Sequence, residues 1–133
     1  MRASDLNPDV ALKALLKDVG VDVYEYASQP NTVKANSFIS MRSNGIINSL
    51  TKPQGVYNGN IALRIHCRMY PDNTANVIET RRLARLCDDL VNCKVSGEYY
   101  FELDTLNPIT DINPNPTSGY SEYLLNVAWR TPA

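Results

Sequence analysis

The sequence predicts an α+β domain: one mostly antiparallel sheet of four to five strands, with two helices packed on one of its faces. Three observations predict this fold. Residues 61–69 alternate between apolar and polar side chains, which is the period of a half-buried strand. Residues 74–90 follow directly, with leucines at helical spacing. Residues 9–19 show the same helical spacing, and helices gathered on one face of an antiparallel sheet are a stable arrangement for such elements.

The remaining elements are predicted from capping residues and alternation. Asn7 is expected to cap the first helix, with Pro8 at its first position and Gly20 as its C-terminal cap. Asn76 and Glu79 have the spacing of a capping box at the start of the second helix. Further strands are expected at residues 21–26, 37–42, 98–105 and 120–130.

Length and composition indicate an ordinary soluble domain. The chain has 133 residues, which suits a single domain over residues 1–133 and suffices to bury a core. Its formal net charge of -1 argues against a general nucleic-acid binder, which would carry a basic excess. No stretch resembles a signal peptide or approaches the ~20 apolar residues that span a bilayer. We therefore expect a cytosolic protein without membrane contact.

The number and positions of the three cysteines indicate that their thiols are reduced. Cys67, Cys87 and Cys93 cannot all pair within one chain. Two of them occupy positions that we expect to be buried, where a free thiol behaves as a small apolar side chain. Reduced thiols agree with a cytosolic compartment. Their spacing lacks the close pairs of a zinc site, and we expect no metal and no cofactor.

Two long segments rich in turn-forming residues interrupt the predicted elements, at residues 43–55 and 106–119. Loops of this length in a small domain are commonly functional or mobile. We expect their apolar side chains to contact another subunit. These side chains are Ile46, Ile47, Leu50, Ile109 and Ile112.

Alternation also predicts a polar sheet face. Arg64, His66 and Arg68 point away from the predicted core, and we interpret His66 as a surface-facing residue of its strand. Eight tyrosines against two phenylalanines suit a subunit contact, because tyrosine combines contact area with a polar tip. The face is expected to be open to water or to a partner. Its other members are Tyr100, Glu102, Asn126 and Arg130, and Tyr57 is a further candidate contact near a loop.

No catalytic motif stands out in the sequence. There is no phosphate-binding loop, no GxSxG turn and no nucleophile with a partner base at a recognisable spacing. Glu102 and Asp104 share a strand face and are interpreted as part of a charged cross-strand ladder rather than as an acid–base pair. We therefore expect a protein that is not an enzyme.

The order of elements resembles that of the tail-terminator, or tail-completion, proteins of long-tailed bacteriophages. They begin with a helix like residues 9–19 and a short strand like residues 21–26. Their middle strand ends in an aromatic residue and runs into an amphipathic helix, as residues 61–70 run into residues 74–90. Two strands close the chain, the last like residues 120–130. The similarity covers essentially the whole chain and lies in its layout.

This resemblance implies a structural virion protein. It would form a hexameric ring on the end of the tail tube, stop tube polymerisation and join the tail to the head. Its partners would be further copies of itself, the tail-tube protein and a head-completion protein. It would assemble in the host bacterial cytoplasm and remain in the virion. The candidate interface residues are Arg64, Arg68, Arg130, Ile46, Ile47, Leu50, Tyr57, Tyr100, Ile109 and Ile112.

Three alternatives remain open from the sequence. A phage neck or head-completion protein has a similar layout and would bind on the portal side. A small α+β enzyme or ligand-binding domain would have its pocket residues dispersed along the chain. A nucleic-acid-binding module would use Arg64, His66 and Arg68 beside Tyr70 and Tyr100, and its binding would fall steeply with salt.

Overall fold

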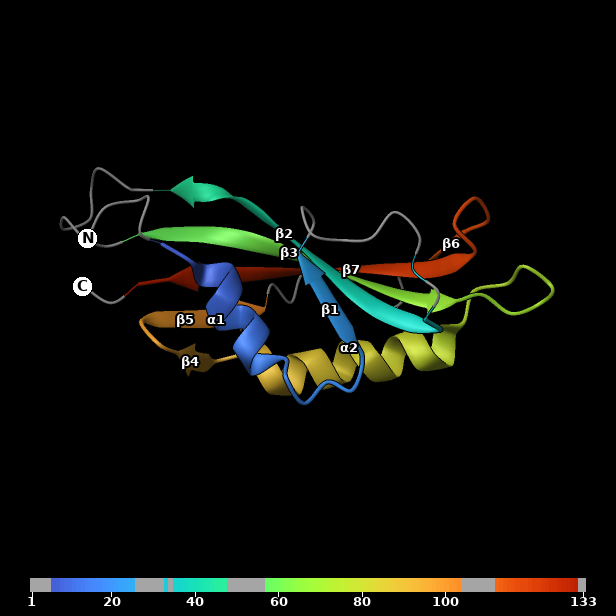
Figure 1. Cartoon of the computed structure of the whole chain (residues 1–133), viewed down its shortest axis with the longest axis horizontal. Coiled ribbons are helices and arrows are strands. Elements are labelled where there is room, and N and C mark those ends of the chain that lie inside the picture. The colour runs from blue at the N-terminus through green and yellow to red at the C-terminus, as the bar shows by residue number, and fades with distance from the viewer. Residues whose placement is uncertain (1–5, 26–32, 34, 48–56, 104–111, 132–133) are drawn as a thin grey trace.

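The computed structural model describes residues 6–25, 33, 35–47, 57–103 and 112–131, and the side chains of all of these except residues 44–47. Two helices and seven strands lie within this part of the chain (Figure 1). In order they are α1 (Pro8–Leu15), β1 (Asp22–Glu25), β2 (Ser37–Ile47), β3 (Asn58–Arg68), α2 (Val77–Val91), β4 (Lys94–Ser96), β5 (Tyr99–Leu103), β6 (Asn113–Asn115) and β7 (Tyr120–Arg130).

All seven strands form one curled, half-barrel sheet of mixed direction. The strand order is β1-β2-β3-β7-β5-β4, and β6 also pairs with β7. β1 runs parallel to β2, whereas the other pairings are antiparallel. β3 and β7 pair along their full lengths, from Asn58 opposite Arg130 to Arg68 opposite Tyr120. These two strands run side by side through the centre of the sheet (Figure 1).

The predicted fold class is wrong, because the structure is mostly sheet and has seven mixed strands instead of four to five mostly antiparallel ones. β4 and β6 have three residues each, too few for an alternating pattern to be recognised. The side-chain pattern of β1 does not indicate that this strand pairs in parallel with β2. Residues 43–47, predicted as part of a loop, instead continue β2 past a register shift between Ser43 and Ile46.

The helix ends agree with their predicted caps only in part. Asn76 caps α2 as predicted, since its Oδ1 accepts a hydrogen bond from the backbone N–H of Glu79 at 3.3 Å. Asn7 precedes α1 but forms no side-chain cap. Its Oδ1 instead accepts a hydrogen bond from the Tyr99 hydroxyl, 3.2 Å away. α1 ends at Leu15, earlier than predicted, and Gly20 lies beyond it with a left-handed φ of +83°.

The core lies between the sheet and both helices. The odd-numbered residues of β3 from Ile61 to Cys67 are fully buried, as alternation predicted. Leu12 of α1 and Leu83 of α2 pack in the same cluster, so both helices cover the same sheet face. Each large apolar side chain buried there contributes about 1.5–3 kcal/mol. Neither described helix has the length and apolar content needed to cross a membrane.

Candidate functional site

The sheet face opposite the helices carries the only histidine of the chain together with arginine, glutamate, serine and tyrosine side chains, and we call it the polar face. The registers of β2, β3, β7 and β5 fix its membership, because alternate residues of paired strands share a face. Neither α1 nor α2 packs on it. Its main members are Phe38, Ser40, Arg42, Arg64, His66, Arg68, Tyr100, Glu102, Tyr120, Glu122 and Arg130.

His66 lies at the centre of the polar face and is buried, with 8% of its surface exposed. The ring of Phe38, its neighbour on β2, stacks on the imidazole with centroids 4.3 Å apart and planes 6° apart. The ring of Tyr120 on β7 stands edge-on to it at 6.3 Å. The prediction that His66 faces the surface is therefore wrong, because aromatic side chains from both neighbouring strands cover it.

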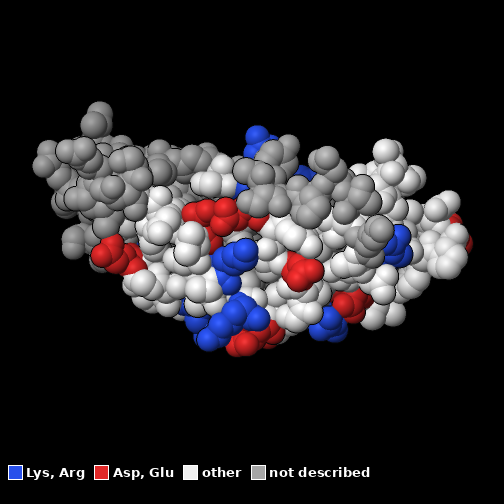
Figure 2. Space-filling view, in the orientation of Figure 1, with Lys and Arg blue, Asp and Glu red and all other residues white. Residues whose placement is uncertain are grey.

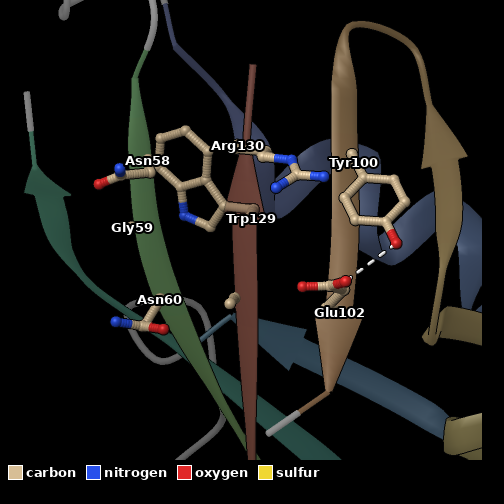
Figure 3. A pocket seen from close by; sticks show the side chains of 8 residues that line it. Asn58, Gly59, Asn60, Tyr100, Glu102, Trp129 and Arg130 are labelled. Carbon is tan, nitrogen blue, oxygen red and sulfur yellow. Dashed lines mark hydrogen bonds between the residues drawn. The ribbon is translucent and has the colours of Figure 1, made fainter. Parts of the chain in front are cut away.

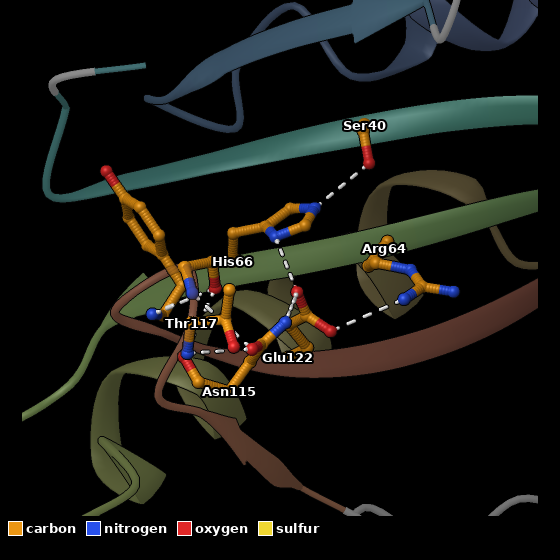
Figure 4. Close-up of polar contacts among 8 residues, drawn as sticks. Ser40, Arg64, His66, Asn115, Thr117 and Glu122 are labelled. Atoms are coloured by element: carbon orange, nitrogen blue, oxygen red, sulfur yellow. Dashed lines mark hydrogen bonds and ion pairs between the residues drawn. The ribbon is translucent and has the colours of Figure 1, made fainter. Parts of the chain in front are cut away.

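Both ring nitrogens of His66 face a polar group (Figure 4). Nε2 lies 3.0 Å from the hydroxyl oxygen of Ser40 on β2. Nδ1 lies 3.7 Å from Oε1 of Glu122 on β7. Glu122 in turn accepts hydrogen bonds from Arg64 Nη1 at 3.3 Å and from Asn115 Nδ2 at 3.2 Å. Side chains from four strands thus meet around one imidazole.

The electrostatic surroundings keep this imidazole neutral at pH 7. Burial lowers the pKa of His66 to about 4; the nearby Glu122 opposes this shift and Arg64 adds to it. A neutral imidazole carries one proton, and a carboxylate facing Nδ1 favours that proton on Nδ1. Nε2 is then an acceptor for the Ser40 hydroxyl.

A hollow of about 320 Å³ opens beside this cluster. Ala62 pairs directly with Arg42, and its small side chain leaves space between the longer side chains on either side. The hollow therefore joins a buried Ser–His contact to two guanidinium groups. It is lined by Ser40, Met41, Arg42, Ala62, Arg64, His66 and Glu122.

A second hollow, of about 260 Å³, lies toward the other end of β3 and β7 (Figure 3). The guanidinium of Arg130 stacks over the ring of Tyr100 at 4.6 Å, and the Tyr100 hydroxyl donates a hydrogen bond to Glu102 at 3.1 Å. Gly59 and Ala128 add little side-chain volume here. The hollow is lined by Asn58, Gly59, Asn60, Tyr100, Glu102, Ala128, Trp129 and Arg130.

The structure brings four of the predicted interface residues onto one face. Arg64, Arg68 and Arg130 share the polar face with Tyr100, as alternation predicted. Arg68 lies over the ring of Tyr120 at 5.1 Å and donates a hydrogen bond to its hydroxyl at 3.2 Å. All three arginines are therefore held by contacts within the chain.

The other predicted interface residues lie elsewhere. Tyr57 and Ile112 are half-buried and pack against the hydrophobic core. Ile46 and Ile47 pair with Gly59 and Asn58 at the end of β2, and their side chains are not among those described. Leu50 and Ile109 lie outside the described residues.

Sequence reasoning missed Ser40 and Glu122. Each falls on the polar face of its own strand, so alternation alone could have placed it there. What brings both to His66 is the register between strands, which one strand's pattern does not specify. Ser40 and Glu122 are separated from His66 by 26 and 56 positions, so no sequence motif joins them.

The side of the molecule shown in Figure 2 carries mixed charges, and no metal-binding cluster occurs among the described residues. In the view of Figure 2, basic and acidic side chains lie interspersed over the helices and form no single basic patch there. Glu79 and Arg82 of α2, for example, form an ion pair at 2.6 Å. No group of three or more His, Cys, Asp or Glu in the described part of the chain could hold a metal ion. The three cysteines are unpaired, with Cys93 exposed.

Comparison with known proteins assigns no family to this arrangement. No family model matches the sequence, and no match to a curated protein reaches significance.

Proposed function

We propose that the protein is a structural component of a long-tailed bacteriophage. It caps the tail tube as a hexameric ring, ends tube polymerisation and joins the tail to the head. The order of the elements supports this role. α1 and β1 precede the long antiparallel pair of β2 and β3, β3 leads into α2, and the remaining strands follow. This order is similar to the layout of the tail-terminator proteins, although the seven-stranded sheet is larger than we predicted.

The observation that carries the proposal is the polar face with its three anchored arginines. Arg64 is held by Glu122, Arg68 by Tyr120 and Arg130 by Tyr100. The side chain of Arg64 remains 49% exposed despite this contact. Side chains already held in place lose less conformational entropy when a partner binds. The polar face is thus suited to receive an acidic surface.

A closed ring adds a geometric requirement. Each subunit of a cyclic hexamer meets its two neighbours through two different surfaces, because the contacts are heterologous. We assign the polar face to one of these surfaces, and its counterpart is an acidic surface on the next copy. The tail-tube protein and a head-completion protein bind the two ends of the ring. Assembly takes place in the host cytoplasm, and the ring remains in the virion.

Native mass spectrometry and negative-stain images of the purified protein, alone and mixed with phage tail tubes, test this proposal. We expect a ring of six, or a cap at one end of each tube, and tubes that no longer elongate. A strict monomer that leaves tube growth unchanged would overturn the proposal. A ring that binds the portal and ignores tubes would point instead to a neck protein.

Charge reversal tests the assigned surface. Changing Arg64→Glu and Arg68→Glu together should weaken ring formation while the monomer stays folded, because the reversed charges repel an acidic neighbour. The matched control is Lys13→Glu with Lys17→Glu, which makes the same change in net charge at two exposed positions, one in α1 and one just after it. Unchanged assembly in the arginine variant, or an equal loss in the lysine variant, would contradict the assignment.

A further inference from the structure

The contact between Ser40 and His66 has no part in the proposed ring. We propose that Ser40 is a nucleophile activated by His66, and that the adjacent hollow takes an acyl ester bearing a negatively charged group. The three side chains come from neighbouring strands, β2, β3 and β7. This activity does not depend on the protein being a tail component.

The atoms occur in the order that nucleophilic catalysis requires. The Ser40 hydroxyl faces Nε2 at 3.0 Å, while the other ring nitrogen faces the Glu122 carboxylate at 3.7 Å. In serine hydrolases the base takes the hydroxyl proton through one nitrogen, and a carboxylate orients it through the other. The second distance is longer than a hydrogen bond. Such contacts are often long without substrate and shorten when it binds.

The surroundings hold the imidazole ready to act as a base. The stacked ring of Phe38 fixes its plane, and burial keeps it neutral at pH 7, so Nε2 can accept the Ser40 proton. Ser40 is only 9% exposed, yet its side chain lines the hollow of about 320 Å³, through which an ester can reach it. A histidine of such low basicity is a weak general base, so the reaction is slow.

The hollow also supplies positive groups for the charges of the substrate. The backbone N–H groups of paired strands are directed into the ladder and cannot form an oxyanion hole. Arg42 and Arg64 line the same hollow as Ser40, and each guanidinium presents five N–H donors. A guanidinium can stabilise the oxyanion of a tetrahedral intermediate, and a second one can bind a carboxylate elsewhere on the substrate. This pair of cations favours an anionic ester over a neutral one.

The reaction proceeds in two steps, acylation of Ser40 and hydrolysis of the resulting ester. Ser40 Oγ attacks the acyl carbon and its proton moves to His66 Nε2. The bond from the acyl carbon to the alcohol oxygen breaks, and the same proton passes to the departing alcohol, leaving an acyl ester on Ser40. Water then attacks this ester and gives a proton to Nε2. The ester bond breaks, the carboxylic acid leaves, and the proton returns to Ser40.

A fluorophosphonate probe, with the labelled site identified by mass spectrometry, tests the proposal on the intact chain. We expect one label, on Ser40, and none after Ser40→Ala. The matched control is Ser43→Ala, which removes an exposed serine from the same strand and should label normally. Replacing His66→Gln should slow labelling about a hundredfold, the size of a general-base contribution. Competition by a short dicarboxylic acid monoester should exceed that by its neutral diester.

Folding controls distinguish loss of the nucleophile's activation from loss of the folded structure. If His66→Gln does not fold, Glu122→Gln replaces it, and we expect at least about a tenfold slower label because the imidazole loses its orienting carboxylate. Circular dichroism confirms that each variant is folded. Absence of label on Ser40 in the wild-type protein would overturn the proposal. So would labelling that persists unchanged in a folded His66 or Glu122 variant, or in the unfolded chain.

Discussion

His66 shows how a single residue connects three strands. Its ring nitrogens face Ser40 on β2 and Glu122 on β7, while Phe38 stacks on one face of the ring and Tyr120 stands edge-on to it. A leucine there would fill the space but leave both polar neighbours without that contact. The residue therefore contributes to stability through its neutral form, and this makes stability depend on pH.

The pH dependence has a definite sign. Burial lowers the pKa of His66 from 6.5 to about 4, so the unfolded chain binds this proton more readily than the folded one. The contribution of His66 is complete above pH 6.5 and is lost as the pH falls toward 4. The two pKa values correspond to a total loss of about 3 kcal/mol, of which about 2 kcal/mol appears between pH 7 and pH 5.

Urea unfolding at a series of pH values measures this loss. His66 is the only histidine in the chain, so the difference between the wild-type protein and His66→Gln isolates it from the carboxyl groups. The variant should be less stable at pH 7 and lose less stability than the wild type on going to pH 5. Parallel curves for the two proteins would contradict the prediction.

At the residue scale, the sequence was informative about faces and uninformative about neighbours. Alternation placed Arg64 and Arg68 together correctly, because both depend only on the period of β3. It failed for the burial of His66, which depends on Phe38 lying opposite in the β2 register. It failed to bring Ser40 to the site for the same reason. Register is a property of two strands and of the turn between them.

The elements that were predicted well are the long ones with a clear period. β3, α2 and β7 have eleven or more residues each and repeat their apolar side chains several times. β4 and β6 are too short to show a period, and the end of β2 lies beyond a bulge that interrupts its alternation. The predicted number of strands was therefore too low, and the predicted fold class was wrong as a result.

The N-terminus of α2 offers a test of its predicted cap. Asn76 Oδ1 accepts the N–H of Glu79, and Asn76 Nδ2 donates to the carbonyl oxygen of Arg68 at 3.3 Å. We expect Asn76→Ala to lower the free energy of unfolding by about 1 kcal/mol, because a helix donor loses its acceptor. The midpoint of urea unfolding reports this change, provided that the dependence of the unfolding free energy on urea concentration is the same in both proteins.

The matched control for this cap is Asn76→Asp. Its carboxylate can still accept from Glu79 and is favoured by the positive end of the helix dipole, so most of the stability should remain. An equal loss in both variants would mean that the amide nitrogen, rather than the cap, provides the stabilisation.

At the scale of the whole molecule, the proposed ring has a contact face rich in arginine. Interactions between exposed charges weaken as salt screens them, and the screening length falls from about 10 Å at about 0.1 M salt to about 3 Å at about 1 M. We therefore expect the ring to dissociate toward the monomer over this range. Sedimentation velocity across the salt series measures the shift.

The double lysine variant provides the comparison for the salt series. Lys13→Glu with Lys17→Glu should follow the wild-type salt dependence, since those exposed positions lie away from the polar face. A ring that forms equally well across the range would indicate a contact made mainly by apolar side chains. Such a contact would be made by predicted interface residues other than the arginines, such as Ile46, Ile47, Leu50 and Ile109.

The position of β7 has a consequence for how the protein is made. β7 follows the other described strands in the sequence, yet it pairs with β3 along its whole length and with β5 and β6 on its other side. A chain emerging from the ribosome therefore holds β3 and β5 with unpaired edges until residues 120–130 appear. Unpaired strand edges are sites of misassociation. Nascent chains are thus most exposed to wrong partners just before synthesis reaches this strand.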